Sequence, residues 1–189
     1  MIVVEKTNNG IEQYDLPSRL MKDRIIMVEG EVNSHMASVI VQQLLYLDSV
    51  DNTTPITMHI NTPGGSVIDG LMITDTMSLI KAPVHTVVIG LAASMGSIIA
   101  SSGQKGHRYM LPHARYMIHQ PSGGAQGQQT NIAIAAAQIL KTRKELNTIL
   151  ANNSGQPYDK VEADTERDYW MTTEEAIEYG FVDQLLAKM

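Results

Sequence analysis

Ser94 is the residue of this chain best placed to act as a nucleophile. It follows the apolar run from Val84 to Ile89, which predicts a buried strand, and it precedes the small and apolar residues 98–102, which predict a short helix. A hydroxyl at such a corner is held by two stiff elements, and the N–H groups that open the helix are free to stabilise an oxyanion. Serine is also a preferred helix N-cap, so a purely structural role stays open at this point.

A serine nucleophile needs a base within hydrogen-bond reach, and His119 is the best candidate among the six histidines. It closes the apolar segment Tyr116–Ile118 and should lie at the same sheet edge as Ser94. His59 and His85 fall within predicted strands, and His35 falls on a predicted helix face. His107 and His113 lie in an irregular polar stretch. We expect His35, His59 and His85 to pack against neighbours or to lie at the surface, and His107 and His113 to face solvent.

A carboxylate would set the tautomer of the histidine, and the cluster of Asp164, Glu166 and Asp168 offers three candidates. Spacing does not choose among them, and a solvated acidic surface would explain the same residues. With Asp168 as the third member, the order serine, histidine, aspartate differs from the orders in trypsin-like, subtilisin-like and α/β-hydrolase enzymes. A triad in this chain would therefore belong to another fold.

Two backbone N–H groups could stabilise a negatively charged oxygen. Gly64 and Gly65 come shortly after a predicted strand, and consecutive glycines let the backbone approach a substrate closely. The N–H groups of Gly65 and Met95 would then face each other across neighbouring strand ends. A tight turn that requires glycine would explain the same pair.

A repeated pattern of strand, turn and helix positions these residues. Four strand-like segments recur at intervals of 30 or 31 residues, at Ile25, Ile56, Thr86 and Tyr116. This is the length of a right-handed βαβ crossover, so the strands should stack in parallel. Ligands bind at the carboxyl edge of parallel α/β sheets, where the candidate serine, histidine and glycine N–H groups should meet. The sequence predicts an α/β fold of stacked βαβ units.

Residues 1–23 are of mixed polarity and predict a loosely attached arm. Asn8-Asn9-Gly10 predicts a turn, and Leu16-Pro17 predicts a break in the chain. Ser34 is the predicted N-cap of the first long helix. The arm therefore precedes a body, or head domain, that we assign to residues 24–119 and 156–189.

Residues 120–155 are predicted to form a separate handle. A glycine-rich segment follows His119 and is either flexible or able to lie as a strand against a partner strand. The longest predicted helix runs from Thr130 to about Asn153 and would be about 35 Å long. It would either overhang the body and bury its apolar stripe against another subunit, or lie flat on the sheet.

Thr172 and Glu175 predict a capping box on a short helix that ends at Gly180.

Composition excludes several classes of function. The chain of 189 residues is 43% hydrophobic and 18% charged, as in ordinary globular proteins. A net charge of −6 without a basic cluster argues against a nucleic-acid surface. The absence of cysteine excludes thiol catalysis, disulfides and cysteine–zinc sites. No signal peptide or membrane-spanning run is evident, so we expect a soluble, cytoplasmic protein.

The chain resembles the ClpP family of serine peptidases, the proteolytic subunits of the Clp protease. The likeness runs from about Val3 to Leu186 and is carried by Ser18–Leu20, Ile60–Gly65, Ala92–Gly96, Met117–Pro121, Gly123–Gln128, Asp164–Asp168 and Ala176–Gly180. The resemblance implies Ser94 as nucleophile, His119 as general base and Asp168 as its orienting carboxylate. It also implies Gly65 and Met95 as oxyanion donors, with no metal or organic cofactor.

The same resemblance implies an assembly. Family members share the stacked βαβ superhelix of ClpP and crotonases and form two stacked heptameric rings around a closed chamber. The handle lies between the rings, and Arg167 pairs across that junction. A Clp-type AAA+ ATPase threads unfolded polypeptides into the chamber. Thr57 and His59 depart from the aromatic residues that line the family's ATPase-docking pocket, as does Pro17 in the N-terminal segment.

Two other functions use features of the same sequence. A crotonase-type acyl-CoA hydratase or isomerase shares the stacked βαβ plan and the paired backbone donors, although such chains are longer. A non-catalytic scaffold subunit of mixed rings would keep the fold without the chemistry. Reaction of Ser94 with a fluorophosphonate would favour the peptidase over both.

Overall fold

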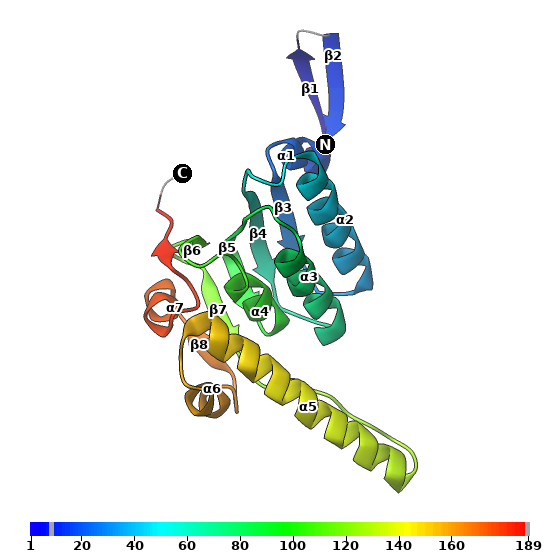
Figure 1. Cartoon of the computed structure of the whole chain (residues 1–189), viewed down its shortest axis with the longest axis vertical. Helices are drawn as coiled ribbons and strands as arrows, with labels where there is room; N and C mark the ends of the chain where they lie inside the picture. The colour runs from blue at the N-terminus through cyan, green and yellow to red at the C-terminus, as the bar shows by residue number, and fades with distance from the viewer. Residues whose placement is uncertain (8–9, 188–189) are drawn as a thin grey trace.

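A twisted sheet carries helices on one face, and two segments project from this body in opposite directions, the N-terminal hairpin and a long helix (Figure 1). The structure is a computed structural model that describes residues 1–7 and 10–187. Its elements are β1 (Ile2–Thr7), β2 (Gly10–Asp15), α1 (Leu16–Lys22), β3 (Ile25–Glu29), α2 (Ser34–Val50), β4 (Ile56–Thr62), α3 (Val67–Leu79), β5 (Val84–Ala93), α4 (Met95–Ser101), β6 (Arg108–Met110), β7 (Arg115–Ile118), α5 (Gln129–Ser154), α6 (Tyr158–Asp164), β8 (Tyr169–Met171), α7 (Thr173–Tyr179) and β9 (Gln184–Leu185).

The main sheet has the order β3-β4-β5-β6-β9, and all of these neighbours are parallel. β5 is long enough to pair twice, with β6 through its first half and with β7 through its second half. β8 then adds to β7 in antiparallel orientation. The predicted series of parallel crossovers is confirmed, and it brings the ends of β4, β5 and β7 together.

The alternation of side chains explains how the layers pack. Every second residue of β4 is buried: Ile56, Met58 and Ile60 belong to the hydrophobic core, and the fourth is the polar Thr62. The buried residues of α2 are Ala37, Ile40, Leu44 and Leu47, which recur every three or four positions and so form one helix face. α2, α3 and α4 lie next to one another over the sheet (Figure 1).

The N-terminal segment is more ordered than its composition predicts. The break predicted at Leu16-Pro17 coincides with the boundary between β2 and α1, and proline lies in the first turn of α1, where its missing N–H is not needed. The Asp15 carboxylate caps this helix by accepting a hydrogen bond of 2.8 Å from the Ser18 N–H. β1 and β2 form an antiparallel hairpin, and the turn predicted at Asn8-Asn9 lies outside the described residues.

Two predicted helix caps have different outcomes. Asn33, and not Ser34, is the N-cap of α2, and its side-chain oxygen accepts from the N–H groups of His35 and Met36. The capping box of α7 is confirmed, because Thr172 and Glu175 exchange hydrogen bonds between side chain and backbone. The helix ends at Gly180 as predicted.

α5 projects from the body along most of its 26 residues (Figure 1). Its buried residues all lie near its carboxyl end: Leu146, Asn147, Leu150 and Ala151. Of the two arrangements predicted for this helix, the structure therefore has the overhanging one. Residues 120–128 run beside α5 but contain no strand, since within one chain this segment has no second strand with which to pair.

Candidate active site

Ser94 occupies the sharp corner between β5 and α4 and has a strained backbone. Its φ and ψ are 54° and −122°, a conformation that costs a non-glycine residue about 1–3 kcal/mol. Hydrogen bonds hold the corner: the Ser94 N–H donates to the Met117 carbonyl at 3.0 Å, and the Ser94 carbonyl accepts from the Ser97 N–H and hydroxyl. The Ser94 side chain makes no capping hydrogen bond to α4. The alternative of a simple N-cap is therefore wrong.

An irregularity in β5 helps to place this corner. Ile60 of β4 pairs with Val88, but Thr62 pairs with Ala92, so β5 bulges between these positions. The Asn61 side-chain oxygen fills the bulge and accepts from the Leu91 N–H at 3.2 Å. A side chain at Gly90 would collide with the same oxygen.

His119 joins the serine to a carboxylate. Its Nε2 lies 2.8 Å from Ser94 Oγ, and its Nδ1 lies 3.0 Å from Asp168 Oδ1. Because an ionised carboxylate only accepts hydrogen bonds, Nδ1 carries the ring proton and Nε2 is left to accept from the serine hydroxyl. The pairing of β7 with β8 explains the meeting: Ile118 lies opposite Tyr169 in an antiparallel ladder, so the residues beyond them, His119 and Asp168, also meet.

The structure selects among the three acidic candidates. Asp168 contacts the histidine, whereas Glu166 forms an ion pair of 2.8 Å with Arg143 of α5. Asp164 contacts Lys160 and accepts from the Tyr179 hydroxyl. Only Asp168 is at the position where a third catalytic member is needed, and no sequence spacing indicated this choice.

Gly64 and Gly65 form a turn that lies directly against Ser94. A Cβ at Gly64 would lie 2.7 Å from Ser94 Cβ and 2.9 Å from the Met95 nitrogen, and its φ is +93°. Only glycine permits this approach. Among the described residues, the N–H groups of Gly65 and Met95 donate to no other protein group, so both are free for a ligand oxygen.

An apolar pocket opens beside the serine. It is lined by Val67, Met95, Ile98, Pro121, Leu146 and Leu150, together with Ser94, Ser97 and His119. Through Val67 and Pro121 it adjoins a cleft of about 370 Å³ that includes residues of α3 and α5. The pocket at the serine itself measures only about 20 Å³, so the adjoining cleft is the space that could take a substrate side chain.

The remaining predicted residues lie elsewhere. Arg167 is exposed next to Asp168, and Thr57 and His59 lie half-buried on β4 before its carboxyl end. The expectation that His107 faces solvent is wrong, because its ring stacks on that of His85 with centroids 4.2 Å apart. Burial, and then the neighbouring His107, lower the pKa of His85.

Residues 1–7 and 10–187 contain neither a metal-binding cluster nor a membrane-spanning helix. No group of three or more histidine, aspartate or glutamate side chains there could hold a metal ion. Over the same residues, no helix has both the length and the apolar character needed to span a bilayer.

Comparison with known proteins identifies the family. The family model for Clp protease matches residues 7–189. An ATP-dependent Clp protease proteolytic subunit of Leuconostoc citreum (strain KM20) is 61% identical over 188 residues, which is 98% of this chain and 94% of that protein. A protein of the same name from Streptococcus salivarius is 58% identical over 188 residues, which is 98% of this chain and 96% of its own. The matched region spans positions 94, 119 and 168, and the chain belongs to the Clp protease family.

Proposed function

We propose that this serine endopeptidase of the Clp family cleaves unfolded polypeptides with Ser94 as nucleophile, His119 as general base and Asp168 as the carboxylate that orients the base. One observation carries the proposal: the hydroxyl, the imidazole and the carboxylate are joined in series by contacts of 2.8 Å and 3.0 Å. Catalysis also requires stabilisation of an oxyanion, and the free N–H groups beside the hydroxyl can supply it.

The reaction follows from these positions. Ser94 Oγ attacks the carbonyl carbon of the peptide while its proton passes to His119 Nε2, and the carbonyl oxygen takes the negative charge. The N–H groups of Gly65 and Met95 hold that oxygen. When the intermediate collapses, the carbon–nitrogen bond breaks and His119 returns the proton to the leaving amine. Water, deprotonated by the same histidine, then releases the acyl group from Ser94.

We also propose that the chain acts in two stacked heptameric rings fed by a Clp-type AAA+ ATPase in the cytoplasm. The relatives are named ATP-dependent proteolytic subunits, which supports an ATPase partner. The projecting part of α5 exposes Ile132, Ile134 and Leu140, which supports burial of this helix between copies. Arg167 is exposed beside Gln120 and Pro121, where the projection leaves the body, and would pair across the ring junction.

A labelling experiment tests the catalytic assignment. The assembled protein is treated with a fluorophosphonate probe, and the modified peptide is identified by mass spectrometry. We expect an adduct on Ser94 that is lost in Ser94→Ala and kept in Ser102→Ala, a control whose hydroxyl donates to the Ile98 carbonyl and accepts from the Asn153 side chain, away from the site. Failure of the assembled rings to react would favour a scaffold subunit, and turnover of acyl-CoA substrates would favour a crotonase-type enzyme.

A further inference from the structure

We propose that Thr62 is a positioning residue for catalysis, whose buried hydroxyl holds the Gly64-Gly65 turn so that the Gly65 N–H faces the carbonyl attacked by Ser94. This inference rests on the proposed function, because it assigns Thr62 a task within the same site. Thr62 does not touch the reacting atoms. It acts through the turn.

The hydroxyl of Thr62 links two segments. Thr62 is the last residue of β4 and is completely buried. Its Oγ1 donates a hydrogen bond of 2.5 Å to the Gly30 carbonyl and accepts one of 3.0 Å from the Gly64 N–H. Both capacities of the hydroxyl are therefore used, and the turn is tied to the segment that follows β3.

The other side of the turn is held by Val32. The Val32 N–H donates to the Gly64 carbonyl at 2.8 Å, and the Val32 carbonyl accepts from the Ser66 N–H at 2.9 Å. The peptide between Gly64 and Gly65 is planar and trans, so its carbonyl and its N–H point in opposite directions. Because the carbonyl points at Val32, the Gly65 N–H points away from Val32. Thr62 fixes the preceding N–H and so restrains rotation of this plane.

The methyl group of Thr62 contacts α4, the helix whose first residue, Met95, carries the second oxyanion donor. A Cβ at Gly96 of α4 would lie 2.5 Å from Thr62 Cγ2, so the methyl rests directly on the helix backbone two residues after Ser94. Met95, which supplies the other N–H, lies between these two residues. One side chain thus contacts both the turn that carries one donor and the helix that carries the other.

Removal of the Thr62 hydroxyl would leave the Gly64 N–H without a hydrogen-bond partner, beside a side chain that is fully buried. Because an unpaired buried N–H is costly, the turn would gain by reorienting. Loss of an oxyanion donor costs about 100- to 1,000-fold in turnover, and a misplaced donor costs part of that. Substrate side-chain contacts in the cleft between α3 and α5 do not depend on this donor. The effect should therefore fall on kcat.

The test compares Thr62→Val, which keeps the shape and removes the hydroxyl, with Thr62→Ser, which keeps the hydroxyl. Thr86→Val is the matched control, since Thr86 is also buried and its hydroxyl donates at 2.8 Å to the Ala100 carbonyl, away from the site. In assembled protein, kcat and KM are measured with a fluorogenic peptide. The inhibition constant of a peptide boronic acid is measured in parallel, because its tetrahedral adduct places an oxygen between the two donors.

For Thr62→Val we expect kcat to fall at least about tenfold, the boronate to bind more weakly by a similar factor, and KM to stay within about twofold. Thr62→Ser and Thr86→Val should keep both kcat and boronate affinity within about threefold of the unmodified protein. A structural role alone would lower the melting temperature of both valine variants without this selective loss of boronate affinity.

The inference is overturned if Thr62→Val retains kcat and boronate affinity, or if Thr86→Val loses them equally. If Thr62→Val does not assemble, Thr62→Ser decides, since a tenfold loss of both quantities with the hydroxyl present would also overturn it. Failure of the proposed function looks different: the unmodified protein would then not react with a fluorophosphonate at Ser94 at all.

Discussion

Ser94 holds a backbone conformation that L-amino acids rarely adopt, and two glycines lie where the chain packs most closely around it. Gly64 and Gly96 approach the corner from two sides, and a Cβ on either would collide with the residues they touch. The strain lifts the hydroxyl out of both the strand and the helix and leaves the adjacent N–H groups free. The geometry of the site therefore depends on the absence of a Cβ atom at Gly64 and Gly96.

Asp168→Asn should reduce the rate of fluorophosphonate labelling at Ser94 by at least about 100-fold, because an amide can donate to Nδ1 and so favour the tautomer that cannot accept the serine proton. The rate is measured on protein whose assembly is checked by sedimentation velocity. Asp159→Asn, on an exposed turn of α6, is the control and should react at the unmodified rate. An assembled Asp168→Asn protein that reacts equally fast would contradict the assigned role.

Gly64→Ala should abolish measurable peptidase activity and lower the melting temperature. The added methyl would lie 2.7 Å from both the Ala93 carbonyl oxygen and Ser94 Cβ, at a φ of +93° that alanine tolerates poorly. Gly124→Ala is the comparison, since nothing lies within 4 Å of its Cβ position and its φ is not in the left-handed region. Activity in an assembled Gly64→Ala protein would show that the turn is more adaptable than this packing indicates.

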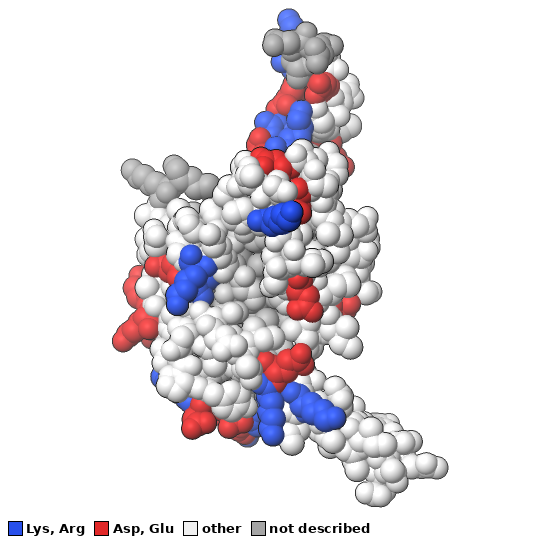
Figure 2. Space-filling view, viewed as in Figure 1, with Lys and Arg blue, Asp and Glu red and all other residues white. Residues whose placement is uncertain are grey.

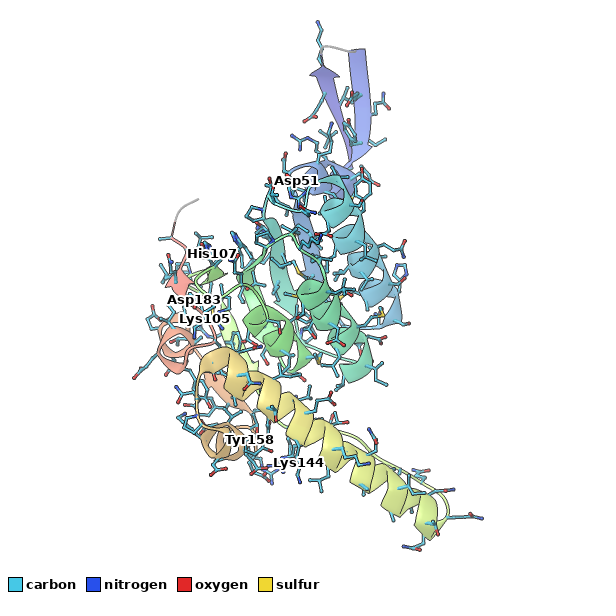
Figure 3. All side chains as sticks on the ribbon, in the orientation of Figure 1. Asp51, Lys105, His107, Lys144, Tyr158 and Asp183 are labelled. Carbon is cyan, nitrogen blue, oxygen red and sulfur yellow. The ribbon has the colours of Figure 1, made fainter. Side chains whose placement is uncertain are left out.

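Among the elements, the pairing of short strands does most to assemble the site. β7 uses the second half of β5 and delivers His119, and β8 returns antiparallel to β7 and delivers Asp168. A separate clamp secures the C-terminal segment. Arg108 of β6 is buried and joins Asp183 through its side chain and its backbone N–H. Asp183 is labelled in Figure 3, near the end of the chain where β9 completes the sheet.

This clamp predicts a pH dependence of stability. Burial by itself would raise the pKa of Asp183, but hydrogen bonds from Arg108 and from the Gly106 N–H outweigh it and hold the pKa below its ordinary value. A carboxyl with a depressed pKa stabilises the folded state above its unfolded-state pKa, near 4, and loses that contribution as the pH falls further.

We expect the urea midpoint of the unmodified protein to fall more steeply below about pH 4 than that of Asp183→Asn, which should be less stable at pH 7. The fluorescence of Trp170, the single tryptophan, can follow unfolding. Parallel pH curves for the two proteins would mean that the Asp183 pKa is not perturbed by folding.

The body of the molecule carries charged residues, whereas the tip of the projecting helix α5 carries none. No charged residue occurs from Gln120 to Leu140, and the tip of the projecting helix is correspondingly white in Figure 2. Isoleucines at 132 and 134 and Leu140 are exposed there in the single chain. An exposed apolar surface without charges is typical of an interaction site, which agrees with the proposed assembly through α5.

Ile134→Glu should prevent association of rings and halve the sedimenting mass, because it places a charge in the proposed junction. Lys144→Glu is the control: Lys144 is also exposed on α5, but it is already charged and lies closer to the body (Figure 3). Sedimentation velocity at several protein concentrations gives the mass. An unchanged mass for Ile134→Glu would place the junction elsewhere.

The amino-acid sequence by itself determined the crossover repeat, the strand-to-helix corner at Ser94, the capping box at Thr172 and the length of α5. These depend on periodicity, capping and residue size, which act over a few neighbouring residues. The choice of Asp168, the overhang of α5, the stacked His85–His107 pair and the links from Thr62 to Gly30 and Gly64 were decided only by tertiary structure. The contacts of Asp168 with His119, of His85 with His107 and of Thr62 with Gly30 each join residues distant in the chain, and their formation depends on strand pairing and packing that no local pattern encodes.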